Sequence, residues 1–94
     1  MPTLHWSSRY QKAFERKTKQ NPLLSEKIVE TMRMIERDPL NLKLRTHKLR
    51  GKFEGSWACS VDYDMRIVFE FVTNPTTQQE EILLVDIGSH DEVY

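Results

Sequence analysis

The first part of the chain carries apolar residues at helical spacing. Ser7-Ser8 supplies a helix N-cap, and the residues after it follow the period of a first helix until Asn21-Pro22 interrupts the pattern. A second helix is predicted to begin near Leu23, capped by Asn21 or Ser25, and to end at Asp38-Pro39. Its apolar stripe consists of Leu24, Ile28, Met32 and Ile35. Two helices joined by so short a break predict an antiparallel hairpin.

The later part of the chain carries strand patterns. Residues 57–61 alternate between apolar and polar side chains, residues 66–72 are rich in β-branched and aromatic residues, and residues 82–87 form a third apolar run. Short polar links join these three strands, which predicts an antiparallel meander. A brief edge strand is predicted at residues 3–6, before the helices. Residues 40–52 have no sustained period and are interpreted as a basic connection.

The order of these elements predicts an α+β fold, because the helices precede the strands and do not alternate with them. We expect an N-terminal edge strand and a two-helix hairpin packed on one face of an antiparallel β-sheet, with the other face available. Ninety-four residues with 38% hydrophobic content predict a single domain over residues 1–94.

Cysteine content and hydropathy suggest the compartment. The single cysteine, Cys59, excludes an internal disulfide and favours a reducing environment, so we expect a cytoplasmic protein. No apolar run approaches the roughly 20 residues that span a bilayer, and the start of the chain does not resemble a signal peptide, so no membrane association is expected.

Charge is distributed unevenly along the chain although the net charge is zero. Residues 1–52 hold 13 basic and 5 acidic residues, whereas residues 53–94 hold 1 basic and 9 acidic residues. A ten-residue stretch without acids suits phosphate contacts, although a solvated loop explains such a stretch equally well. Its basic residues are Lys43, Arg45, Lys48, Arg50 and Lys52.

The candidate chemistry lies after the third strand, where a glycine is followed by His90 and Tyr94. RNA carries its own nucleophile, the 2′-hydroxyl, and its cleavage needs a base, an acid and a cation for the phosphorane but no metal. His47 and His90 suit the two proton roles, and Arg66 suits the phosphate. Tyr94 can stack on a base or donate a proton.

Each of these residues also has an ordinary structural explanation. His47 fits an exposed loop, Arg66 fits an ion pair with Asp62 or Asp64, and Trp57 fits a packing role. Three histidines without a spaced pair do not indicate a metal site, and no cofactor is expected.

Four segments together resemble the RelE/ParE superfamily of bacterial toxins, and most closely its YafQ-like and YoeB-like ribosome-dependent mRNA endonucleases. The segments are His47-Lys48-Leu49-Arg50-Gly51, Gly55-Ser56-Trp57, Met65-Arg66-Ile67-Val68-Phe69, and Ile87-Gly88-Ser89-His90 followed by Tyr94. The resemblance implies that His47 and His90 are catalytic, that Arg66 holds the scissile phosphate and that Tyr94 is the terminal aromatic residue. It also places Asp64 at an aspartate implicated in the YafQ site.

The sequence departs from the family pattern at two positions. Ser60 stands where YafQ-like enzymes have a second histidine, and Asp86 stands where they have an arginine before the glycine. Arg66 would then have to supply the positive charge alone, and weaker or altered activity would follow.

The resemblance implies a toxin of a type II toxin-antitoxin pair that cleaves mRNA in the ribosomal A site. The expected partners are a cognate antitoxin, the ribosome and mRNA, with a monomeric toxin inside a toxin-antitoxin hetero-oligomer. The basic stretch and Trp57 are expected to bind RNA. Two alternatives remain open: a ParE-like gyrase inhibitor without nuclease activity, and an inactive homologue that only binds antitoxin.

Overall fold

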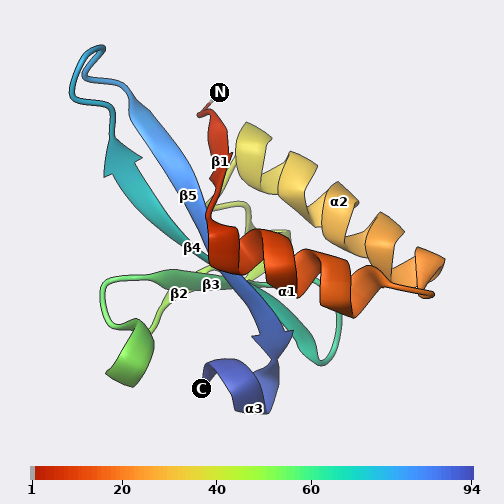
Figure 1. Ribbon diagram of the computed structural model, residues 1–94. Coiled ribbons are helices and arrows are strands. Elements are labelled where there is room, and N and C mark those ends of the chain that lie inside the picture. The colour runs from red at the N-terminus through yellow and green to blue at the C-terminus, as the bar shows by residue number, and fades with distance from the viewer. Residues whose placement is uncertain (1) are drawn as a thin grey trace.

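The computed structural model describes residues 2–94, which form a five-stranded sheet with two long helices (Figure 1). The strand order is β1-β5-β4-β3-β2, with β1 parallel to β5 and all other neighbours antiparallel. The predicted α+β fold is confirmed, and the parallel edge strand makes the sheet mixed. The elements are β1 (Leu4–Trp6), α1 (Ser8–Thr18), α2 (Pro22–Arg37), the 3-10 turn η1 (Leu42–Leu44), β2 (His47–Lys48), the 3-10 turn η2 (Gly51–Phe53), β3 (Trp57–Ser60), β4 (Met65–Thr73), β5 (Glu80–Ser89) and α3 (His90–Val93).

Both long helices begin at side-chain caps. The Ser7 hydroxyl accepts the Tyr10 backbone N–H at 3.0 Å, and the Asn21 side chain accepts the Leu24 N–H at 3.2 Å. Asn21 is therefore the cap of α2, and Ser25 lies inside the helix. Pro22 occupies the first helical turn, where its missing N–H removes no intrahelical bond.

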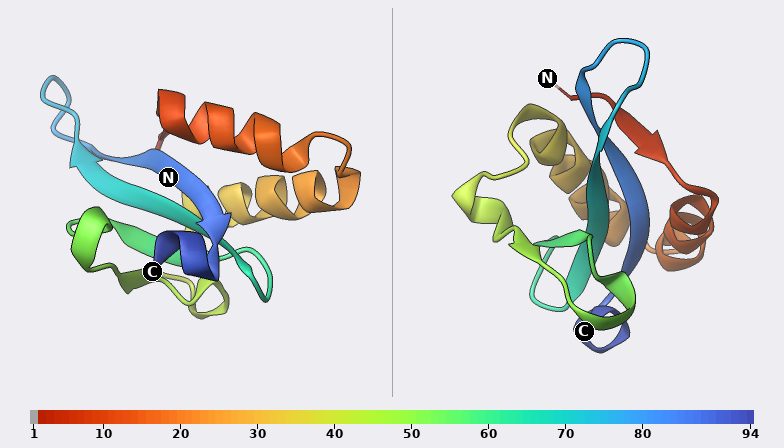
Figure 2. Two further views of the ribbon diagram at one scale, coloured as in Figure 1. Left: turned by 60° about the horizontal axis from the view of Figure 1, so that its bottom comes forward. Right: turned by 90° about the vertical axis from the view of Figure 1, so that its left-hand side faces the viewer.

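The helices cover one face of the sheet and form with it the helix-side core. Figure 2 shows α1 and α2 side by side, and their buried residues meet the apolar side chains of β3, β4 and β5. The helix-side core comprises Tyr10, Ala13, Ile28, Met32, Ile35, Leu44, Cys59, Ile67, Phe69, Ile82, Leu84 and Ile87. Burial raises the pKa of the Cys59 thiol to about 12, so this cysteine is a packing residue and not a nucleophile.

The other face of the sheet, predicted to be available, is partly covered. Two segments fold over it: the stretch from β2 to η2, and the short helix α3. The right-hand view in Figure 2 shows α3 beside η2, and Phe53 of η2 and Val93 of α3 belong to one buried cluster. The residues buried here form the opposite-face cluster, which comprises Leu49, Phe53, Ala58, Val68 and Val93.

A bulge in β5 shifts the alternation of the strand by one residue, so that Ile82 and Leu84 before it and Ile87 after it all face the helices. Phe69 pairs with Leu84 and Val68 pairs with Asp86, so Val85 has no partner in β4. Leu84 belongs to the helix-side core, whereas Val85 packs against the opposite-face cluster. The bulge thereby sets the direction of the end of β5, from which α3 begins.

Within residues 2–94, no helix has the length and apolar content needed to cross a membrane.

Candidate functional site

Three predicted site residues meet at the end of the sheet, and we name them the histidine-tyrosine cluster: His47, His90 and Tyr94. The Tyr94 hydroxyl is hydrogen-bonded to Nε2 of His47. The two rings stack with centroids 5.4 Å apart, and the His90 ring lies 4.5 Å from the same tyrosine. All three side chains are exposed, so a ligand can reach them.

The protonation of His47 follows from its second hydrogen bond. Its Nδ1 lies 2.8 Å from the backbone carbonyl of Arg45, which can only accept, so Nδ1 carries the hydrogen. In the neutral ring Nε2 then has the free lone pair, and the Tyr94 hydroxyl donates to it. Arg45 adopts the left-handed conformation with φ of 53°, which turns the chain into β2. This turn presents Nε2 as a proton acceptor.

A capping box holds α3 in place. The Ser89 hydroxyl accepts the Glu92 N–H at 3.3 Å, and the Glu92 carboxylate accepts the Ser89 N–H at 2.8 Å. The same carboxylate accepts from Lys17 Nζ at 2.6 Å, which ties α3 to α1. The Lys17 hydrogen bond, followed by the Ser89 backbone N–H, lowers the pKa of Glu92 to about 2. Although α3 has only one turn, three polar contacts fix it.

Gly88 allows α3 to approach β5 closely. A Cβ at this position would lie 3.0 Å from Cβ of Glu92 and 3.2 Å from Cγ2 of Val93. Such contacts are tighter than ordinary packing tolerates. An added Cβ would therefore make Glu92 or Val93 shift by a few tenths of an ångström, so the glycine favours the observed position of α3.

Asp64 contacts the backbone of His90 and not its ring. The Asp64 carbonyl accepts the His90 N–H at 2.9 Å, and its carboxylate oxygen Oδ1 lies 3.4 Å from the same nitrogen. Throughout residues 2–94, no hydrogen bond joins Asp64 to the side chain of His47 or Arg66. Asp64 acts as an anchor for the start of α3.

Arg66 lies on the same sheet face as His47 but does not touch the histidine-tyrosine cluster. Its Nη1 donates to the carbonyls of Asp62, Tyr63 and Met65 at 2.9, 3.1 and 3.2 Å. In the part of the chain that is described, Nε and Nη2 donate to no protein atom. The guanidinium therefore lies over the β3–β4 turn with donors still free. It borders a pocket of about 400 Å³ together with Lys43, Arg45, Ser60, Val61, Asp62 and Tyr63.

The basic stretch does not form one surface. Lys43 and Arg45 share the pocket of Arg66, whereas Lys48 and Arg50 line another with Trp57. Lys48 Nζ lies 5.4 Å from the centre of the Trp57 ring. Trp57 packs against the helix-side core, so it faces away from His47. Lys52 lines a third pocket, described next.

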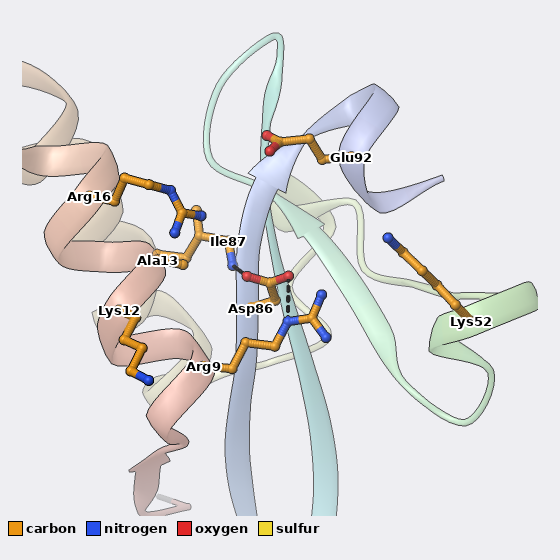
Figure 3. Close-up of a pocket in the computed structure, with 8 residues that line it drawn as sticks. All are labelled: Arg9, Lys12, Ala13, Arg16, Lys52, Asp86, Ile87 and Glu92. Atoms are coloured by element: carbon orange, nitrogen blue, oxygen red, sulfur yellow. Dashed lines mark hydrogen bonds and ion pairs between the residues drawn. The ribbon is translucent and has the colours of Figure 1, made fainter.

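Sequence reasoning missed a basic groove beside α1, which we call the α1 groove. It has a volume of about 540 Å³ and is lined by Arg9, Lys12, Ala13, Arg16, Lys52, Asp86, Ile87 and Glu92. Figure 3 shows the α1 side chains along one side and Lys52 on the other. The spacing of the three α1 cations, three and four residues apart, was the available signal, because such residues share a helix face. The Ser89-x-x-Glu92 capping box was likewise the signal for α3.

Among residues 2–94, no group of three or more histidine, cysteine or acidic side chains is arranged to hold a metal ion.

A family model for the bacterial toxin of a type II toxin-antitoxin system, YafQ, matches residues 2–94. The chain belongs to the YafQ toxin family. No curated protein matches this chain significantly. Solved toxin structures share the fold of this chain, as expected from the sequence. Membership of the family shows that the chain is a toxin of a type II toxin-antitoxin system.

Three solved structures illustrate how the YafQ fold is shared. The YoeB/ParE toxin from Agrobacterium tumefaciens has a TM-score of 0.75 at 18% identity, covering 94% of this chain and 98% of that one. A conserved hypothetical protein from Helicobacter pylori has a TM-score of 0.71 at 26% identity, with 100% of both chains covered. YafQ in the Escherichia coli DinJ-YafQ toxin-antitoxin complex has a TM-score of 0.73 at 16% identity, covering 99% and 97%.

Proposed function

We propose that this YafQ-family toxin is a ribosome-dependent mRNA endonuclease that cleaves by attack of the 2′-hydroxyl on the adjacent phosphate. The observation that carries the proposal is that the imidazoles of His47 and His90 both contact Tyr94. The hydrogen bond of His47 Nδ1 to the Arg45 carbonyl leaves Nε2 as a proton acceptor. A binding-only inhibitor has no use for such an arrangement of titratable groups.

His47 acts as the general base in this proposal. The substrate 2′-hydroxyl takes the place of the Tyr94 hydroxyl at Nε2 and gives up its proton there, while the Arg45 carbonyl keeps Nδ1 protonated. The displaced Tyr94 ring is then free to stack on a base of the mRNA.

His90 acts as the general acid and Arg66 as the phosphate ligand. A protonated His90 gives its proton to the departing 5′-oxygen, which completes the transfer without a metal. The free Nε and Nη2 donors of Arg66 suit the phosphorane, whose charge they stabilise. Asp64 contributes by holding the backbone of His90 and the start of α3. In the structure the guanidinium of Arg66 is held at the β3–β4 turn and does not contact the two histidines. It must therefore move toward them when substrate binds.

The partners follow from charge and from the family. Lys43, Arg45, Lys48 and Arg50 would contact ribosomal RNA or mRNA in a salt-dependent way, and Trp57 would support Lys48. A cognate antitoxin would neutralise the toxin in a hetero-oligomer, as the DinJ-YafQ complex suggests. We place this activity in the cytoplasm and in one domain over residues 1–94.

The test is inducible expression in a bacterium that lacks the antitoxin, with mapping of mRNA 5′ ends. The wild type should arrest growth and create new 5′ ends within translated frames, and His90→Ala should abolish both. The matched control is His5→Ala, since His5 pairs with Glu81 at 2.8 Å on the distant edge of the sheet and should be dispensable.

Two results would contradict the proposal. Full arrest with His90→Ala would remove His90 from the site. Arrest without new 5′ ends, accompanied by loss of gyrase supercoiling activity, would establish the ParE-like alternative.

A further inference from the structure

The α1 groove carries more positive charge than the protein itself neutralises. Arg9, Lys12 and Arg16 lie along one face of α1, and Lys52 approaches from η2 (Figure 3). Arg9 is paired with Asp86. Within residues 2–94, no carboxylate lies within 4 Å of the charged ends of Lys12, Arg16 or Lys52. Three cations therefore face a groove of about 540 Å³ without an anionic partner.

The edge of β5 already holds one anion in this groove, supplied by the protein. Asp86 accepts the Ile87 backbone N–H at 2.8 Å through Oδ1 and the Arg9 Nε–H at 3.0 Å through Oδ2. The Ile87 amide is available because β1 pairs only with residues 82–84, so this part of β5 is an unpaired edge. A strand-edge amide beside a guanidinium is an anion-binding arrangement. The carboxylate of Asp86 shows that an anion fits there.

The α1 groove and the histidine-tyrosine cluster lie on opposite sides of α3. Glu92, which lines the groove, lies on α3 between His90 and Tyr94. Lys52 follows β2, the strand that carries His47, by only four residues. A polymer that leaves the cluster across α3 or η2 reaches the groove directly.

We propose that the α1 groove is a second phosphate-binding site, which holds backbone phosphates of the single-stranded RNA whose scissile phosphate lies at the histidine-tyrosine cluster. The proposal rests on the proposed nuclease function for the identity of the polymer. Lys12, Arg16 and Lys52 bind the phosphates, and Asp86 lowers the affinity by occupying the adjacent anion position. The guanidinium of Arg16 suits a phosphate because it can donate two parallel hydrogen bonds.

Two kinds of substitution in the α1 groove should change RNA binding in opposite directions. Asp86 neutralises Arg9 in this groove. Removal of its charge should free Arg9 for the ligand and strengthen RNA binding. Loss of Lys12 and Arg16 should weaken it.

The experiment measures the binding of a fluorescent 2′-O-methyl single-stranded RNA dodecamer by anisotropy at several salt concentrations. This probe has no free 2′-hydroxyl and cannot be cleaved, so binding is measured apart from catalysis. The test variant is Lys12→Gln/Arg16→Gln. The matched control is Lys19→Gln/Arg33→Gln, which removes the same two charge types from exposed positions outside the groove.

The test variant should bind the probe roughly tenfold more weakly at low salt, as expected for two exposed ionic contacts. The slope of log affinity against log salt should fall by about 1.4, since each phosphate contact on a single strand contributes about 0.7. The control should bind within about twofold of the wild type. Asp86→Asn, which keeps an oxygen for the Ile87 amide, should bind about threefold more tightly.

Equal losses in the test and control variants would overturn the proposal, because they would reflect overall charge alone. Unchanged RNA binding combined with weaker binding of a decaglutamate peptide would also overturn it and would assign the groove to an acidic protein segment. If mRNA cleavage is absent while the groove variants still change RNA binding, the nuclease proposal fails and the phosphate site stands.

Discussion

The two faces of the sheet are packed in different ways. Among residues 2–94, the helix-side core contains twelve buried residues from the two long helices, η1 and the central strands. The opposite-face cluster contains five, and its outer members Leu49, Phe53 and Val93 retain 4%, 6% and 3% exposure. One face is thus covered mainly by two long helices, and the other by the stretch from β2 to η2 and the single turn of α3.

The candidate catalytic groups all belong to the thinly covered face. His47 enters it on the two-residue strand β2, and His90 and Tyr94 enter it on α3. Segments held by few apolar contacts open more easily than a core, which suits groups that must admit a large substrate. The larger part of the buried core and the candidate catalytic groups therefore lie on opposite sides of the same strands.

The largest effect should come from truncating one phenylalanine on each face. Phe69→Ala, at a position with 0% exposure, should lower the free energy of unfolding by about 3–5 kcal/mol. Phe53→Ala should cost less than the lower end of this range, because η2 can relax into the space. Urea unfolding of the two variants measures the difference. Equal losses would show that both faces are equally important for stability.

Gly88→Ala should have an intermediate effect confined to the thin face. The added Cβ meets Glu92 and Val93, so the variant should lose about 1–3 kcal/mol of stability and displace α3. Amide hydrogen exchange should increase in residues 89–94 and remain unchanged in α1 and α2. An unchanged α3 together with toxicity at the wild-type level would contradict the role given to this glycine.

The smallest effect should come from the ion pair that ties α3 to α1, and it should depend on pH. The pKa of Glu92 is about 2 in the folded chain, below its ordinary value of 4.5, so its contribution is present above pH 4.5 and is lost as the pH falls toward 2. Because the pair is exposed, Glu92→Gln should cost about 0.5 kcal/mol at pH 7. Unfolding free energies of the variant and the wild type should converge near pH 2. A constant difference between them at all pH values would contradict the role of charge.

The sequence predicted the parts of the fold that have a repeated pattern. The helix stripes, the cap at Ser7 and the three strands of the meander were found because each repeats its signal over several residues. β2 and α3 were not, since two and four residues are too few to show a period. The prediction that the second face of the sheet is available was partly wrong for the same reason. Leu49, Phe53 and Val93 cover part of it, but they lie on or beside these short elements.

The candidate site was partly predictable. The residue types and their order indicated His47, His90 and Tyr94, which the fold brings into contact. The hydrogen bonds of Arg66 to the β3–β4 turn depend on the directions of the backbone carbonyls. Trp57 lies on the opposite sheet face from His47 because of the strand register. Neither is visible in composition or spacing.

The parallel pairing of β1 with β5 has a consequence for how the toxin is produced. Leu4 is opposite Ile82, which lies 78 residues later in the sequence. The edge strand β1 can therefore pair only after nearly the entire chain has been made. Contacts of such long sequence separation carry a large loop-closure cost and slow the folding of a domain. The helical hairpin can form while later residues are still being synthesised, but β5 and the α3 that follows it cannot. A newly made chain therefore cannot assemble the histidine-tyrosine cluster until β5 and α3 have been synthesised.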